Sequence, residues 1–354
     1  MAKEMIEMTT VFAYDESAIA CDQVDIYMLG KTYVPLLYGL VFMIGLAGNL
    51  LVVFIIVKGG QQKSITDIFL LNLAISDLLF VISLPFWGYY VVHGWTLGNL
   101  SCRIVSSFYS IGFFGGMFFI TIISIDRYLA IVHATIFMKA RTTRQGFLTS
   151  LVVWVLAILC AAPQFVFIQK AGSRCVSQYP EYLEDTWPVF CNFEINIIGF
   201  LLPMCIMSIC YFRILRTLFT CKNRRKRKAV RLILQVVLVF FLFWTPHQVL
   251  VLLQTLKLYN VFESCNVLRL LYYTMFVTET LAFSHCCLNP IIYAFAGEKF
   301  KKYLSYLVLK SLSFICFCGP CGHYHGRAPA SLTETVPTSN QTQNTSDQDG
   351  SVLL

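Results

Sequence analysis

Two carboxylates stand inside long stretches of the chain that are otherwise apolar. Asp77 is the one charge in Ile68–Val92, and Glu279 is the one charge in Leu270–Ala296. In the middle of a membrane span a charged residue costs about 2.5–3.5 kcal/mol, so such residues face the interior of a helix bundle and mark functional sites. We therefore expect each carboxylate to bind a polar or cationic group.

Polar side chains in other apolar stretches are candidate partners for Asp77. Asn49, His285 and Asn289 each lie in such a stretch. Hydrogen bonds between membrane helices can hold a bundle together, and a buried carboxylate among polar groups can also bind an ion. A packing network and a rearrangeable, ion-binding network both fit these residues.

Glu279 lies three helical turns before Pro290, and the chain begins with an acidic segment. The first thirty residues carry six acids and one base, with Tyr14, Asp15 and Glu16 side by side. A negative tail attracts a basic partner, and sulfation of Tyr14 would add charge. The pattern predicts a ligand that brings a cationic group to Glu279. A tail that only improves solubility is the alternative.

The sequence lacks the residue motifs that common kinds of enzyme chemistry require. The sequence contains no H-E-x-x-H, G-x-S-x-G or P-loop motif, so we expect no catalytic residue, no cofactor and no enzyme. Cys316, Cys318 and Cys321 could bind zinc with His323 and His325. They follow closely on the last apolar stretch, however, so we interpret them as palmitoylation sites and predict no metal.

The elements that must position these residues are membrane helices. Of the 354 residues, 57% are hydrophobic and 13% are charged, whereas soluble domains carry roughly 25% charged residues. A spanning helix needs about 20 apolar residues, and lipid tolerates only helices and closed barrels. Seven stretches predict an all-α bundle of seven transmembrane helices: Val34–Val57, Ile68–Val92, Ile104–Ile125, Phe147–Gln169, Ile195–Phe212, Leu232–Leu256 and Leu270–Ala296.

The Lys and Arg residues predict the orientation of the bundle. The segments after the first, third, fifth and seventh stretches hold 19 of the 27, and the positive-inside rule places them in the cytoplasm. The N-terminus is then extracellular and the C-terminus cytoplasmic, in a multi-pass plasma-membrane protein. The first thirty residues lack the apolar core of a signal peptide, so we expect the first span to direct insertion. The basic run Arg224–Lys228 lies between two spans and predicts a partner-facing loop, not nucleic-acid binding.

We expect four of the 14 cysteines to form extracellular disulfides: Cys21, Cys102, Cys175 and Cys265. An even number in an oxidising compartment indicates two disulfides. Pairing Cys102 with Cys175 leaves Cys21 for Cys265, but four cysteines allow three pairings and the sequence does not exclude the others. Asn99 opens a glycosylation sequon on the same side.

The chain divides into four parts: an acidic extracellular tail (1–33), a seven-helix domain (34–296), an amphipathic helix on the inner membrane surface (297–310) and a cytoplasmic regulatory tail (311–354). The prediction of the amphipathic helix is based on Phe300, Leu304 and Leu307, which share one face at helical spacing and are flanked by lysines. The last part is rich in Ser and Thr, which predicts a disordered segment with phosphorylation sites.

Motifs within the spans resemble those of the rhodopsin-like G-protein-coupled receptors: Asp126-Arg127-Tyr128, Phe243-Trp244-Thr245-Pro246 and Asn289-Pro290-Ile291-Ile292-Tyr293. With Asn49, Asp77 and Pro203 they match this class across all seven spans. The resemblance implies that Arg127 leaves Asp126 and contacts a G protein when the sixth span swings outward. It implies roles in coupling or activation for nine residues: Asp126, Arg127, Tyr128, Tyr211, Trp244, Pro246, Asn289, Pro290 and Tyr293.

Within this class the chain is similar to the chemokine receptors over roughly residues 10–310. The similarity rests on Asp126–Ala134, Ser284–Pro290, the four outer cysteines, Tyr38, Trp87, Tyr109 and Glu279. Tyr14-Asp15 ahead of Cys21, Leu253–Tyr259 and Val277–Phe300 indicate the fractalkine-binding subgroup, with the CC-type receptors close behind.

This resemblance implies a chemokine ligand, either fractalkine or a related CC chemokine. The ligand would dock on Tyr14, Asp15 and Glu16 and then enter a pocket near five further residues: Tyr38, Trp87, Tyr109, His247 and Glu279. A Gi-type G protein would drive chemotaxis and calcium signalling, and arrestin and receptor kinases would act on the tail. Membrane lipids surround the bundle. Pairing of receptors as homo- or heterodimers stays open.

His247 departs from the pattern, because tyrosine is more usual there, and it could make signalling pH-sensitive. A decoy that binds chemokine without signalling, or a constitutively active virus-derived receptor, is the main alternative; the intact Asp126-Arg127-Tyr128 argues against a decoy. A transporter would need more charges within its spans. A retinal protein would need a lysine in Leu270–Ala296, and an amine receptor would usually place aspartate where Tyr109 stands.

Overall fold

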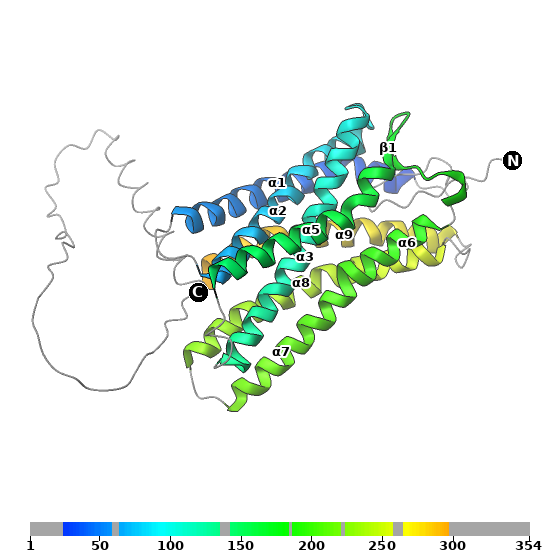
Figure 1. The fold of residues 1–354 in the computed structure, drawn as a ribbon. Coiled ribbons are helices and arrows are strands. Elements are labelled where there is room, and N and C mark those ends of the chain that lie inside the picture. The colour runs from blue at the N-terminus through cyan, green and yellow to red at the C-terminus, as the bar shows by residue number, and fades with distance from the viewer. Residues whose placement is uncertain are drawn as a thin grey trace, which may run out of the picture. The chain divides into compact units, whose positions relative to one another are not determined.

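The computed structural model describes residues 24–58, 64–134, 142–183, 186–220, 224–257 and 265–296. Within these ranges seven long helical segments form an all-α bundle (Figure 1). Six are single helices: α1 (Val24–Lys58), α2 (Ile65–His93), α3 (Asn99–Val132), α5 (Thr143–Phe167), α8 (Arg224–Lys257) and α9 (Cys265–Ala296). The other consists of α6 (Trp187–Phe193), the π-helical η3 (Glu194–Leu201) and α7 (Leu202–Thr220).

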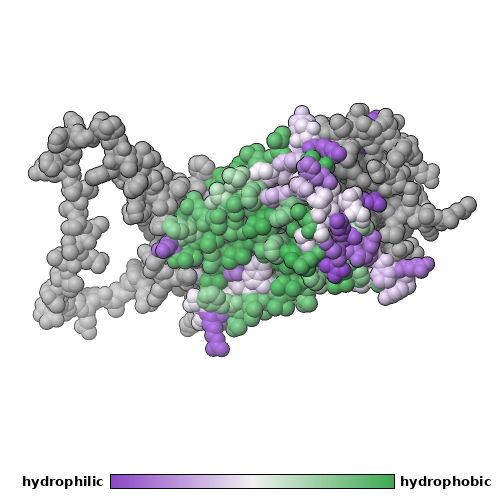
Figure 2. All heavy atoms as spheres, turned by 90° about the horizontal axis from the view of Figure 1, so that it is seen from above, coloured by the Kyte–Doolittle hydropathy of each residue, from purple (hydrophilic) through white to green (hydrophobic). Residues whose placement is uncertain are grey.

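The outer surface of the bundle is apolar. Large side chains on α5 are exposed, among them Leu151 at 61% and Leu159 at 62%. Figure 2 shows a broad hydrophobic surface with hydrophilic residues gathered mainly toward one end. In the described residues, five helical stretches are long and apolar enough to cross a membrane, and α8 contributes the shorter apolar stretch Val237–Leu253. Lipid can cover such a surface, whereas water would leave it unstable.

Short polar caps begin two of the helices. The Ser64 hydroxyl accepts a hydrogen bond from the Asp67 backbone N–H at 3.1 Å, and the Asp67 carboxylate accepts one from the Ser64 N–H at 2.9 Å. Thr142 and Gln145 form the same capping box at the start of α5. Each box satisfies backbone donors that the first helical turn leaves without partners, so both helices begin a few residues before the predicted apolar stretches.

Helix α3 packs so closely against its neighbours that glycine is required at the contacts. A Cβ atom on Gly112 would lie 2.7 Å from the backbone nitrogen of Phe80 in α2, and one on Gly199 of η3 would lie 2.8 Å from the Phe113 ring. Small residues allow membrane helices to approach in this way. The contacts place α3 between α2 and the α6–η3–α7 segment.

The fifth predicted span begins earlier than the sequence indicated. The apolar run starts at Ile195, yet the helix begins at Trp187 and changes to π-helical geometry from Glu194 onward. The Leu202 N–H donates to the Ile197 carbonyl, five residues back. Pro203 has no N–H and cannot complete the α-helical ladder, and a π-bulge is one way in which a helix accommodates this.

Two short antiparallel strands, β1 (Ile168–Ala171) and β2 (Arg174–Ser177), follow α5. The fourth span ends at Phe167, two residues before the predicted boundary, because Ile168 already pairs with Ser177. Gly172 turns the hairpin with a φ of 61°, which favours glycine. We name the end of the bundle that carries β1 and β2 the hairpin end, and the opposite end, where α3 carries Arg127, the arginine end.

Candidate functional site

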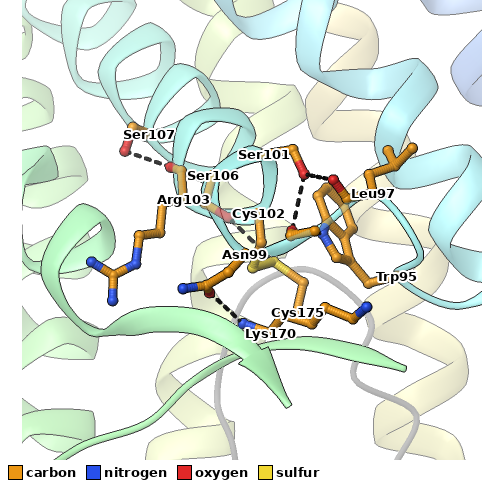
Figure 3. The surroundings of a disulfide bond; sticks show 11 residues. Trp95, Leu97, Asn99, Ser101, Cys102, Arg103, Ser106, Ser107, Lys170 and Cys175 are labelled. Carbon is orange, nitrogen blue, oxygen red and sulfur yellow. Dashed lines mark hydrogen bonds between the residues drawn. A yellow bond between two sulfur atoms is a disulfide. The ribbon is translucent and has the colours of Figure 1, made fainter. Parts of the chain in front are cut away.

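A disulfide joins the hairpin to the start of α3 (Figure 3). Cys102 bonds to Cys175 of β2, which is one of the pairings that the sequence allowed. The backbone N–H of Lys170 donates to the side-chain oxygen of Asn99 at 2.9 Å, so a second contact holds the same corner. Glycosylation of Asn99 stays a prediction. The proposed pairing of Cys21 with Cys265 lies outside the described side chains.

A cavity opens between the helices near the disulfide-bonded hairpin, and its empty space together with the open solvent at its mouth is about 590 Å³. Its lining comes from α2, α3, α5, β1, α6, η3 and α8, and includes Trp87, Tyr109, Phe113, Gln164, Glu194, Trp244, His247 and Gln248. A concave wall that combines aromatic and apolar side chains with polar groups is the usual form of a ligand site.

Several polar atoms of Gln248 and of the predicted ligand residues are buried without a hydrogen-bond partner in the described part of the chain. They are Trp87 Nε1, His247 Nδ1, Glu279 Oε1 and both amide atoms of Gln248, in side chains that are at most 2% exposed. Each such group costs roughly 1–3 kcal/mol. Membrane proteins retain costly polar groups where function needs them, so this side of the bundle suits a polar ligand.

The predicted ligand residues fall into three sets. Trp87, Tyr109 and His247 line the cavity. Tyr38 and Glu279 lie outside its lining, each 1% exposed. An aromatic cluster connects Tyr38 to the cavity residue Tyr109, because the Phe283 ring is 5.5 Å from Tyr38 and 5.6 Å from Tyr109. The predicted docking residues Tyr14, Asp15 and Glu16 lie outside the described residues.

Gln248, Glu194 and Cys191 are among the cavity residues that the search for charges within spans missed. Gln248 is neutral, Glu194 stood one residue before the predicted span, and Cys191 was passed over among the 14 cysteines. Cys191 is a buried free thiol in α6, to which the Tyr179 hydroxyl donates at 3.8 Å. A search for every polar residue near the apolar stretches would have found all three.

Trp244 forms part of the wall of the cavity and continues inward into an aromatic stack. Its ring centroid lies 4.8 Å from Phe113, 5.2 Å from His285 and 6.0 Å from His247. Pro246 interrupts the hydrogen bonding of α8 two residues later. A ligand that displaces these rings would therefore act on α8 beside its proline.

The predicted polar network forms in part. Asn289 donates to Asp77 at 2.9 Å and links α9 to α2, one residue before Pro290 in α9. Asn49 donates to the Cys286 carbonyl at 3.1 Å and links α1 to α9. His285 instead lies against the Ala282 carbonyl of its own helix at 2.7 Å and packs on Trp244. The structure thus places His285 in the aromatic stack rather than beside Asp77.

At the arginine end, Asp126 and Arg127 are buried and partnered. Arg127 Nε lies 3.8 Å from the Asp126 carboxylate. Thr66 of α2, which the sequence search also missed, donates to Asp126 at 3.2 Å and accepts a hydrogen bond from the Arg127 guanidinium. One hydroxyl therefore holds both charged side chains against α2. Its role depends on how α2 and α3 align, which the sequence pattern does not show.

Two further predicted activation residues, Tyr211 and Tyr128, also have polar partners. The Tyr211 hydroxyl accepts a hydrogen bond from Ser124 at 3.4 Å, and Tyr128 lies 3.0 Å from His133 through their polar atoms. The side chain of Tyr293 lies outside the described residues, as do the predicted surface helix (297–310) and Cys316, Cys318 and Cys321.

Comparisons with known proteins agree with this arrangement. The family "7 transmembrane receptor (rhodopsin family)" matches residues 48–293. CX3C chemokine receptor 1 of Bos taurus is 54% identical to the chain over 97% of both sequences, and the Homo sapiens protein of that name is 52% identical over 98% of both. C-C chemokine receptor type 4 of Homo sapiens is 43% identical over 96% of this chain and 93% of its own length.

Proposed function

Since this chain belongs to the rhodopsin family of seven-transmembrane receptors, and within it to the chemokine receptors, we propose that it binds fractalkine or a related CC chemokine and activates Gi-type G proteins. The observation that carries the proposal is the pairing of two sites. A cavity with unpartnered polar groups lies at the hairpin end, and a partnered Asp126–Arg127 cluster lies at the arginine end.

In this proposal the hairpin end is extracellular and the arginine end cytoplasmic. The charge distribution supports this orientation, since most Lys and Arg residues follow the first, third, fifth and seventh spans. A disulfide at the hairpin end fits an oxidising exterior. A basic chemokine first meets the acidic residues around Tyr14, and its N-terminal segment then enters the cavity.

Binding favours the conformer in which α8 moves at Pro246. The link runs through Trp244, which shares the aromatic stack with Phe113 and His285. Release of Arg127 from Asp126 and Thr66 then exposes its guanidinium to the G protein. Receptor kinases and arrestin act afterwards on the Ser- and Thr-rich tail.

The first experiment is Gi activation in cells that express the full chain, titrated with fractalkine and a panel of CC chemokines. We expect a fractalkine response whose potency falls at least about 10-fold in Glu279→Gln, because the cationic group of the ligand then loses its carboxylate partner. Glu181→Gln is the matched control, since Glu181 is exposed and outside the cavity.

The outcomes separate the alternatives. A response to CC chemokines alone would keep the receptor class and overturn the fractalkine assignment. Chemokine binding without any Gi response would indicate a decoy. Full activity without chemokine would indicate a constitutively active receptor.

A further inference from the structure

We propose that Glu194 and Gln248 form a second polar subsite of the cavity, built by η3 and α8 rather than by α9, which binds a cationic group of the ligand together with the adjacent peptide group. The inference rests on the proposed function, because it assumes that a peptide segment enters the cavity. It goes further in naming which chemistry of that segment is read, and by which residues.

Gln248 provides the first part of the subsite. It lies one helical turn from Trp244 on the same face of α8, lines the cavity and is 2% exposed. Neither its oxygen nor its nitrogen has a hydrogen-bond partner among the described residues. A glutamine amide offers two donors and an acceptor. A peptide group presents the complementary carbonyl and N–H, so one backbone amide of a ligand can satisfy both ends of this side chain.

Glu194 provides the second part. It lines the cavity from the start of the π-helical η3, and the thiol of Cys160 in α5 hydrogen-bonds to it. A thiol is a weak donor and leaves most of the capacity of a carboxylate unused. The described residues that line the cavity include no Lys or Arg. An ammonium or guanidinium group of the ligand is therefore the complement that fits.

The π-helical geometry of η3 changes the direction in which Glu194, a residue of the cavity lining, faces. One extra residue in a helical turn rotates all the residues beyond it by about 100° around the helix axis. Relative to a continuous α-helix from α7, Glu194 at the start of η3 thus faces a different direction. Gly199 supports the arrangement, because a Cβ there would meet the Phe113 ring at 2.8 Å.

The first test compares Gln248→Leu with Gln235→Leu, which makes the same change at an exposed position of α8. We expect Gln248→Leu to lower the potency of the activating chemokine about 10-fold, the size of one buried hydrogen-bonded pair. The melting temperature of the purified full-length receptor should stay unchanged or rise by about 2–4 °C, because an unpartnered amide has been removed. Gln235→Leu should change neither quantity.

The second test uses Glu194→Gln, with Glu181→Gln as its control. We expect Glu194→Gln to lower chemokine potency about 10-fold through loss of a charged hydrogen bond. Chemokine acetylated at its amino terminus identifies the source of the cation. If the amino terminus binds Glu194, acetylated chemokine is weak on the wild type and Glu194→Gln weakens it no further. If instead a Lys or Arg side chain of the chemokine binds Glu194, acetylation of the chemokine and Glu194→Gln change potency independently of each other.

The results distinguish failure of the subsite from failure of the proposed function. A wild-type receptor that answers no chemokine in the panel contradicts the proposed function. The melting temperature still decides the subsite in that case, since a clear fall in Gln248→Leu would show that the amide is a structural partner. Unchanged potency in both Gln248→Leu and Glu194→Gln, with a normal wild-type response, overturns the subsite alone.

Discussion

The two ends of the bundle differ in whether their buried polar groups have partners among the described residues. At the hairpin end a disulfide fixes the frame, while Gln248, His247 and Glu279 hold polar atoms without partners in the described part of the chain. At the arginine end the buried charges of Asp126 and Arg127 are partnered with each other and with Thr66 through bonds that can break. A ligand thus gains binding energy by supplying hydrogen-bond partners at the hairpin end. A protein partner gains access to Arg127 when the bonds at the arginine end break.

The largest effect should come from removing the group that the arginine end exposes. Arg127→Ala should reduce Gi activation by roughly 100-fold, because a central arginine is a typical hot spot of an interface. Chemokine affinity, measured by ligand displacement on intact cells, should stay within about 3-fold of wild type, since no cavity residue changes. A matching loss of affinity would show that the ends are not separable in this way.

The second effect concerns the covalent frame. Replacing Cys102 and Cys175 together by serine should cost about 2–5 kcal/mol of stability and lower both the cell-surface level and chemokine binding. Flow cytometry with an epitope tag measures the first and displacement the second. Cys205→Ser, at an exposed free cysteine, is the control. Normal binding by the double variant would mean that the hairpin corner holds its shape through contacts such as Lys170 with Asn99.

The third effect tests whether the arginine end is held closed. Thr66→Val keeps the shape of the side chain but removes the hydroxyl that bonds to Asp126 and Arg127. Loss of about 1–1.5 kcal/mol from the closed state should raise basal Gi activity about 5- to 10-fold. Thr217→Val is the control, because that hydroxyl donates a hydrogen bond to the Arg213 carbonyl of its own helix. Unchanged basal activity would show that Thr66 does not restrain Arg127.

The sequence predicted the fold more completely than the site. Apolar stretches and charges locate the seven helices, since both follow from the chemistry of the bilayer. Among the predicted boundaries that the structure shifts are Ile168 and Trp187, where a strand pairing and a helix continued by polar residues decide the ends. Asp77 and Asn289 were expected together and lie 2.9 Å apart.

The missing site residues share one cause. Thr66 matters because α2 and α3 align it with Arg127, and Glu194 matters because η3 turns it toward the cavity. Both depend on helix geometry in three dimensions, either the alignment of two helices or a local change of helix type, which neither composition nor spacing describes. His285 shows the converse error: its polar type suggested a network, but its neighbours place it among aromatic rings.

The smallest effect concerns a bond at the hairpin end that does have both partners. Asn192 of α6 donates to Thr255 of α8 at 3.1 Å, and both residues are buried, each 3% exposed. Hydrogen bonds between membrane helices contribute about 0.6 kcal/mol on average, so Thr255→Val should change chemokine potency by about 3-fold or less. A Gi titration measures the change. Thr274→Val is the control, because the Thr274 hydroxyl donates to the Leu270 carbonyl of its own helix.

The direction of that small change matters more than its size. If the bond restrains the outer part of α8 in the resting state, Thr255→Val raises potency, and the hairpin end too contains a restraint that ligand binding must overcome. If potency falls, the bond supports the cavity wall that the ligand contacts. The contrast between a fixed hairpin end and a breakable arginine end then holds without exception among the described residues.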